Sequence, residues 1–135
     1  MAKASVVVGL DLVQISAIAS SVAHFGARFL ERVYTADELR YCLREPRSSA
    51  THLAARFAAK EAVRKVLAIG DEAVGWRAIE VVREAGGACA LVLHGEADAR
   101  AQDAGFTAFS LSMTHEADYA SAVVVGERRR DGRIE

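Results

Sequence analysis

Proline, cysteine and long apolar runs are scarce in this chain of 135 residues, and each scarcity excludes a class of protein. Cys42 and Cys89 lie far apart and match neither a metal-binding nor a redox spacing, so we expect both to be reduced and buried. No stretch approaches the roughly 20 apolar residues of a membrane-spanning helix. Asp11 interrupts the apolar N-terminal run, which argues against a signal peptide. We expect a soluble, cytoplasmic protein with no membrane partner.

An excess of charge is also lacking. Lys and Arg number 17 against 18 Asp and Glu, so nothing in the overall balance attracts nucleic acid, and we expect no nucleic-acid partner. Four arginines cluster within 128–133, where a solvated chain end is favoured over a nucleic-acid contact. Hydrophobic residues at 52% suffice for one core. We expect a single domain over 1–127 and a flexible, charged tail over 128–135.

A strong helix-forming run over 48–67 occupies the middle of the chain. Ser48 and Ser49 are candidate N-caps just after the only proline, Pro46, and Gly70 is a candidate stop. At about 100° per residue, one apolar side should face the core. That side comprises Ala55, Ala59, Ala62, Val63 and Val66.

The other two sides of this helix are mixed. Glu61 and Lys65 share a stripe with small alanines, so either another backbone or a ligand must fill the space beside the carboxylate. The plainer interpretation of this stripe is an i,i+4 ion pair. On the third stripe we expect large apolar groups near the surface, among cations. Its members are Leu53, Arg56, Phe57, Lys60 and Arg64.

The remaining segments predict an α+β fold with a mainly antiparallel sheet packed on the long central helix. The first strand is apolar at nearly every position, which is typical of a strand buried on both faces. Thr35 begins a sequence that resembles a capping box. We expect strands over 5–13, 78–84, 88–94, 106–114 and 119–125, a short amphipathic segment over 29–34, and further helices over 14–25, 35–43 and 95–103.

Asp11 is anomalous at the end of an apolar strand, because a buried carboxylate needs a cation, a metal or strong donors. Capping the following helix is an equal alternative. If Asp11 and Glu61 converge, they would suit Mg²⁺, with phosphate oxygens filling the remaining positions. Basic residues available for those phosphates are Arg47, Arg56, Lys65 and His115. The sequence positions alone leave the convergence open.

Three motifs, in order, carry a resemblance to a known family. They are Gly9-Leu10-Asp11, the run RFAAKEAVRK over 56–65, and Ser112-Met113-Thr114-His115 followed by the small-residue strand over 119–123. The segment over 29–35 also matches. Together they resemble the holo-acyl-carrier-protein synthases, the short single-domain branch of the 4′-phosphopantetheinyl transferases.

The resemblance implies that coenzyme A donates 4′-phosphopantetheine to a serine of an apo acyl carrier protein, releasing adenosine 3′,5′-bisphosphate. Asp11 and Glu61 would bind Mg²⁺ and, with Lys65 at the pyrophosphate, would form the catalytic group. Glu61 or a metal-bound water would take the serine proton. Phosphates of coenzyme A would be bound by Arg47, Arg56, Lys65 and His115.

The resemblance also implies a homotrimer with sites between subunits and a role in fatty-acid or polyketide synthesis. Carrier contacts would come from Arg28, Phe29 and Phe57, with Arg32 as a further cation. The chain departs from the family at Ala17, where a basic residue usually docks the carrier, and at Ala68, where glycine is frequent. The alternative is a non-catalytic trimeric module that binds coenzyme A or a carrier.

Overall fold

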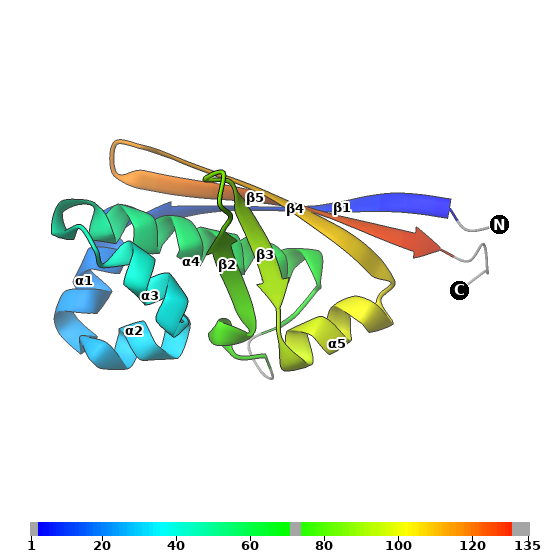
Figure 1. The fold of residues 1–135 in the computed structure, drawn as a ribbon, viewed down its shortest axis with the longest axis horizontal. Helices are drawn as coiled ribbons and strands as arrows, with labels where there is room; N and C mark the ends of the chain where they lie inside the picture. Colours follow the sequence, from blue (N-terminus) through cyan, green and yellow to red (C-terminus); the bar gives the residue numbers. More distant parts are fainter. Residues whose placement is uncertain (1–2, 71–73, 131–135) are drawn as a thin grey trace.

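The computed structural model describes residues 3–70 and 74–130, which form the predicted α+β fold around one long helix (Figure 1). The elements in chain order are β1 (Lys3–Gln14), α1 (Ile15–Phe25), α2 (Ala27–Val33), α3 (Ala36–Cys42), the 3-10 turn η1 (Pro46–Ser48), α4 (Ser49–Val66), the 3-10 turn η2 (Trp76–Ala78), β2 (Ile79–Arg83), β3 (Cys89–Leu93), α5 (Gly95–Asp103), β4 (Phe106–Glu116) and β5 (Tyr119–Arg130). Within the described residues, no helix is both long and apolar enough to span a membrane.

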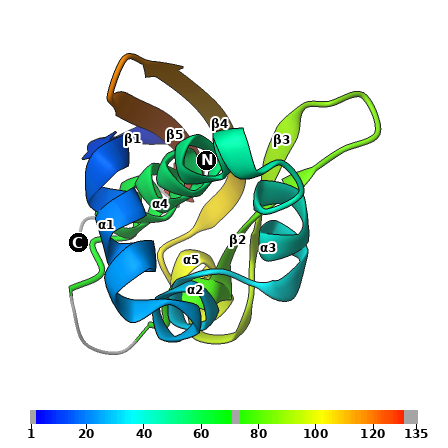
Figure 2. The same ribbon diagram turned by 90° about the vertical axis from the view of Figure 1, so that its left-hand side faces the viewer.

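Helix α4 lies between two antiparallel sheets. The larger sheet has the order β1-β5-β4, and the smaller is the hairpin of β2 and β3. Figure 2 looks along α4 and shows β1 on one side of it and the hairpin on the other. In the larger sheet Asp11 lies opposite Ala122, which in turn lies opposite Met113. Because paired residues share a sheet face, this row faces α4.

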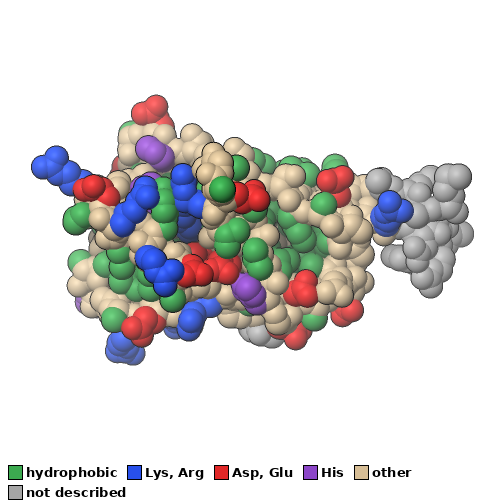
Figure 3. Space-filling view, viewed as in Figure 1, with side chains coloured by type: hydrophobic (Ala, Val, Ile, Leu, Met, Phe, Trp, Pro, Cys, Tyr) green, Lys and Arg blue, Asp and Glu red, His purple; other side chains and the backbone are tan. Residues whose placement is uncertain are grey.

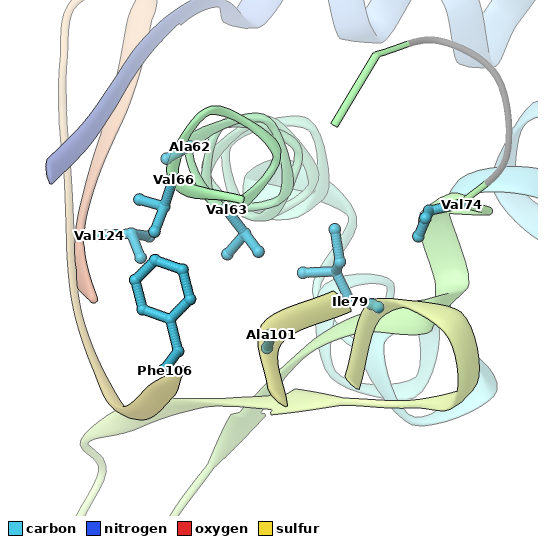
Figure 4. Packing of buried hydrophobic residues seen from close by; sticks show 9 residues of the cluster. Ala62, Val63, Val66, Val74, Ile79, Ala101, Phe106 and Val124 are labelled. Carbon is cyan, nitrogen blue, oxygen red and sulfur yellow. The ribbon is translucent and has the colours of Figure 1, made fainter. Parts of the chain in front are cut away.

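The predicted apolar side of α4 is confirmed as the centre of the core. Ala62 and Val63 are fully buried, and Val66 is 5% exposed. Figure 4 shows Val66 beside Phe106 and Val124, with Val63 projecting from α4 within the same cluster. The core therefore joins α4 to the sheet and to α5.

A glycine allows β1 to approach α4 closely. A Cβ added at Gly9 would lie 2.2 Å from the carbonyl oxygen of Ala62. On the stripe that Glu61 shares, Ala54 and Ala58 are fully buried, in clusters that also contain residues of the large sheet. Close packing against the sheet therefore fills the space at the Ala54 and Ala58 end of this stripe, and a ligand beside Glu61 stays a prediction.

The prediction that β1 is buried on both faces is wrong for the single chain. Its residues facing away from α4 are 59–64% exposed, and they are Val6, Val8, Leu10 and Leu12. The continuous apolar pattern makes both faces of β1 suitable for burial, but within one chain α4 packs on only one of them. The outer face of β1 is an apolar row at the edge of the sheet.

The prediction that large apolar groups of the mixed stripe lie near the surface is wrong for Leu53, which is 1% exposed, and Phe57 is half-buried. The cations of the stripe are buried too. Arg56, Lys60 and Arg64 are 4%, 0% and 7% exposed. The Lys60 ammonium lies 2.8 Å from the carboxylate of fully buried Glu38 and also donates to the carbonyl oxygens of η2 and β2. Burial lowers the pKa of Lys60, and Glu38 opposes that shift. The covering chain supplies acceptors that the helix sequence alone cannot reveal.

Local signals for helix starts had mixed outcomes. Thr35 forms the predicted capping box with Glu38 at the start of α3. Asp11 does not cap α1, because it lies inside β1 and Gln14 occupies the N-cap. The α1 start is instead bound by Asp118, whose carboxylate accepts from the Ser16 amide and hydroxyl at 3.0 and 2.7 Å.

The C-terminal prediction needs a similar correction. Strand β5 continues to Arg130, so the tail expected over 128–135 overlaps it, and positions 131–135 lie outside the described residues. Both cysteines are free, as predicted; Cys42 is buried and Cys89 half-buried. Burial raises the pKa of Cys42 to about 11.

The end of α4 offers a stability test. The helix ends at Val66, before the expected Gly70, and Ala68 adopts a left-handed φ of 54°. That conformation costs a residue with a Cβ roughly 1 kcal/mol or more relative to glycine. We expect Ala68→Gly to raise the melting temperature by a few degrees, measured by circular dichroism. Gly75→Ala, at an exposed glycine with open space and ordinary φ, is the control; a lower melting temperature for Ala68→Gly would contradict the strain.

Candidate functional site

Asp11 meets Lys65 across β1 and α4. The Lys65 ammonium donates to the carbonyl oxygen of Leu10 at 2.7 Å and to the Asp11 carboxylate at 3.2 Å. The Asp11 side chain is 16% exposed and that of Lys65 53%. Glu61 precedes Lys65 by about one helical turn on the same stripe and is half-buried. We call Asp11, Glu61 and Lys65 the β1–α4 site.

The β1–α4 site offers few protein ligands for a metal. Within the described part of the chain, no group of three or more His, Cys, Asp or Glu side chains could hold one. Asp11 and Glu61 supply two carboxylates. Mg²⁺ typically takes one or two protein carboxylates and completes its coordination with water and phosphate oxygens. The donor set therefore fits Mg²⁺ bound together with a phosphate substrate, not a closed structural site.

A second site lies on the other side of α4, where α3, β3 and β4 surround a hollow of about 210 Å³. Its polar lining includes Tyr41, Thr51, His52, Arg56, Arg83, Thr114 and His115. We call it the arginine hollow. Figure 3 shows Lys and Arg side chains gathered on the same half of the molecule as α3. The hollow contains Arg56 and His115, two of the predicted phosphate ligands, whereas Arg47 is exposed on η1 outside its lining.

The arginine hollow is strongly electropositive. Burial lowers the pKa of His52, and the nearby charges of Arg56, Arg44, His115 and Arg83 lower it further. A bound phosphate would oppose these effects, because an anion favours the protonated imidazole. His52, Tyr41 and Arg83 were missed at the sequence level, since they lie outside the three motifs and only the fold brings them to Arg56.

The two sites lie on opposite sides of α4. Arg56 and Lys65 are nine residues apart, which corresponds to about 180° around a helix. In the sheet, Met113 of the hollow is separated from Asp11 by Ala122, so two strand spacings, roughly 10 Å, lie between them. Buried Ala58 and Ala122 fill this interval. A single chain therefore brings Asp11 to Lys65 and Arg56 to His115, but it does not join the two pairs.

The predicted carrier-binding residues separate as well. Arg28 and Phe29 line a surface hollow of about 300 Å³ together with Phe25 and Arg32. Phe57 is half-buried, and its ring stacks on Trp76 at 4.9 Å. The surface hollow at Arg28 combines two cations with two aromatic rings. Phe57, by contrast, is not the exposed apolar side chain that a carrier contact would need.

Comparison with known proteins identifies the family. Residues 7–124 match the family model described as the 4′-phosphopantetheinyl transferase superfamily. The chain belongs to this superfamily. Among curated members, the holo-[acyl-carrier-protein] synthase of Koribacter versatilis is 43% identical over 120 residues, covering 88% of this chain and 95% of that protein. The holo-[acyl-carrier-protein] synthase of Herpetosiphon aurantiacus is 42% identical over 127 residues, covering 89% and 97%.

Solved structures of the superfamily confirm the fold. The ACPS–CoA complex of Chronobacterium ammoniagenes has a TM-score of 0.84 at 33% identity, covering 93% of this chain and 99% of that one. The holo-[acyl-carrier-protein] synthase of Helicobacter pylori in complex with coenzyme A has a TM-score of 0.78 at 29% identity, covering 89% and 99%. This transferase therefore matches the short synthases over nearly their whole length.

Proposed function

We infer that this transferase moves 4′-phosphopantetheine from coenzyme A to a serine of an apo acyl carrier protein. The observation that carries the inference is the match, over nearly the full length, to holo-[acyl-carrier-protein] synthases whose solved structures include coenzyme A complexes. The serine oxygen forms a bond to the β-phosphorus, and the bond from that phosphorus to the bridging oxygen breaks. Adenosine 3′,5′-bisphosphate leaves, and the serine proton passes to a base.

The β1–α4 site is the proposed catalytic group. Asp11 and Glu61 would hold Mg²⁺, which when bound neutralises charge on the pyrophosphate. Lys65, already directed at Asp11, would pair with the pyrophosphate and stabilise the leaving group. Glu61, or a water beside it, would accept the serine proton. These carboxylates and one ammonium are suited to in-line phosphoryl transfer.

The arginine hollow is the proposed binding site for the remaining phosphate. Arg56 and His115 line it, and Arg47 on η1 is the third predicted ligand. Since the hollow and the β1–α4 site are on opposite sides of α4, a complete site needs two subunits. The proposed assembly is a homotrimer, in which each chain gives its β1–α4 site to one neighbour and its arginine hollow to the other.

The apolar outer row of β1 supports this assembly. An edge strand with four exposed large apolar residues favours association unless another surface covers it. A ring closed by three-fold symmetry would cover the row in every subunit. It would also explain why the strand has the composition of one buried on both faces.

The proposed carrier surface combines Arg28, Phe29 and Arg32 with Phe57 behind them. Ala17 is exposed on α1 and leaves that helix without the basic residue common in the family. This change alters the docking of the carrier and leaves the chemistry intact. The proposed setting is fatty-acid or polyketide synthesis in the cytoplasm.

The alternative function is a trimeric module that binds coenzyme A or a carrier without transfer. Ala17 is the observation that favours it, because a retired enzyme no longer needs to dock its carrier productively. Asp11, Glu61 and Lys65 are all present, which favours the enzyme.

Mass spectrometry of the carrier separates the two functions. The protein is mixed with coenzyme A, Mg²⁺ and a panel of apo carriers from fatty-acid and polyketide synthesis. We expect at least one carrier to gain one phosphopantetheine group, because the catalytic residues are intact. Chelation with EDTA should stop the gain, and added Mg²⁺ should restore it. Absence of any gain across the panel, with coenzyme A still bound in a direct titration, would establish the binding module.

A further inference from the structure

Three arginines from three different segments surround one aromatic ring. The guanidinium carbons of Arg44, Arg56 and Arg83 lie 4.2, 4.7 and 4.7 Å from the centroid of the Tyr41 ring. Arg44 follows α3, Arg56 lies on α4 and Arg83 ends β2. These distances are typical of cation–π contacts. Tyr41 is therefore the point at which the three cations meet.

The carboxylates of Asp37 and Glu38 lie close to these cations, on the lining of a neighbouring hollow, but they do not pair with them. Among the described residues, no ion pair within 4.0 Å joins Arg44, Arg56 or Arg83 to a carboxylate. The acidic residues of α3 are engaged elsewhere, Asp37 with Arg40 and Glu38 with Lys60. Like charges gathered around one ring repel one another, so the arrangement favours binding of an anion.

Arg56 has the greatest need of an anionic partner, because it is only 4% exposed. Its hydrogen bond to the Cys89 sulfur, donated from Nη2 at 3.8 Å, is a weak one. A buried guanidinium without a carboxylate is costly unless a ligand completes its hydrogen bonds. The hollow beside it also holds His52 and His115, whose ring nitrogens are further possible hydrogen-bond donors to an anion in the same space.

We propose that Tyr41 is a positioning residue that holds Arg44, Arg56 and Arg83 for a phosphate monoester of the substrate, and that Arg44 and Arg83 are further ligands of that phosphate. Each guanidinium lies over the ring, a contact that does not use its N–H groups as donors to an oxygen. A phosphate monoester carries close to two negative charges, which suits a cluster of three cations. This proposal rests on the proposed function only for the identity of the ligand, the 3′-phosphate that coenzyme A carries.

Direct titration tests the proposal with two probes, adenosine 3′,5′-bisphosphate and adenosine 5′-phosphate, which lacks the 3′-phosphate. Isothermal calorimetry compares the wild type with Tyr41→Phe, Tyr41→Leu, Arg44→Gln and Arg83→Gln. Arg77→Gln, at an exposed arginine on η2, is the matched control for loss of one charge. We expect the leucine and glutamine variants at positions 41, 44 and 83 to bind the bisphosphate about ten-fold more weakly. Tyr41→Phe and the control should stay within two-fold.

The selectivity between the probes decides the outcome. In the affected variants the loss should be confined to the bisphosphate, and the KM for coenzyme A should rise while kcat stays within two-fold. A merely structural role for Tyr41 would weaken both probes equally and overturn the positioning role. If Tyr41→Leu unfolds, the exposed Arg44 and Arg83 decide, and wild-type affinity in both glutamine variants would overturn the proposal. Because calorimetry needs no turnover, failure of the transferase assay is a separate result.

Discussion

Asp11→Ala is expected to reduce transfer to the carrier by roughly three orders of magnitude while leaving the protein folded. The carboxylate is the β1 contribution to the β1–α4 site, and no other acidic side chain of that strand replaces it. Its partner Lys65 is 53% exposed, so its ammonium stays hydrated when Asp11 is removed. Transfer is measured as the initial rate of carrier mass gain, and folding by the melting temperature.

A charge-matched control accompanies this variant. Asp103→Ala removes an exposed carboxylate at the end of α5 and should leave the rate unchanged. A wild-type rate in Asp11→Ala would refute the assignment of Asp11 to the catalytic group. Loss of the rate together with a collapsed melting temperature would instead show that Asp11 is needed for folding.

The same variant tests whether a complete site needs two subunits. His115→Ala removes an exposed side chain of the arginine hollow, and alone it should also lower transfer strongly. In a trimer that mixes Asp11→Ala with His115→Ala chains, one of the interfaces regains both residues. Co-expression at equal amounts should therefore restore about a quarter of wild-type activity. If the mixture is no more active than either variant alone, Asp11 and His115 act within one chain.

Gly9→Ala is the second substitution with a large expected effect, this time on stability. The added Cβ would lie 2.2 Å from the Ala62 carbonyl oxygen and 2.9 Å from a methyl group of Val66. Backbone cannot yield as a flexible side chain can, so β1 must separate from α4, at a cost of about 3 kcal/mol or more. Urea denaturation should show a midpoint lowered in proportion.

Gly86→Ala is the control for this loss. Gly86 lies in the turn between β2 and β3 with open space where its Cβ would be, so its variant should unfold at the wild-type urea concentration. An unchanged midpoint for Gly9→Ala would mean that the sequence tolerates a wider gap between β1 and α4. It would also remove the reason for glycine two residues before Asp11.

Local patterns in the sequence predicted most of the secondary structure. The capping box at Thr35, the helix over 95–103, the hairpin over 78–94 and the alternation in β4 were all confirmed. Each depends on residues a few positions apart, so a short stretch of sequence contains the whole signal. The three motifs likewise identified the family, because they record which residues are needed and in what order.

The sequence motifs, through their family resemblance, predicted that Asp11, Glu61, Lys65, Arg56 and His115 serve a phosphate chemistry. The tertiary structure alone decided how they are grouped. Asp11 meets Lys65 on one side of α4, and Arg56 meets His115 on the other. The fold also places Tyr41 and Arg83 beside Arg56 in the arginine hollow, buries the cations of the mixed stripe, and leaves the outer row of β1 exposed. The physical reason is that spacing along a helix fixes only angles around its axis. What covers each side is supplied by segments far away in the sequence.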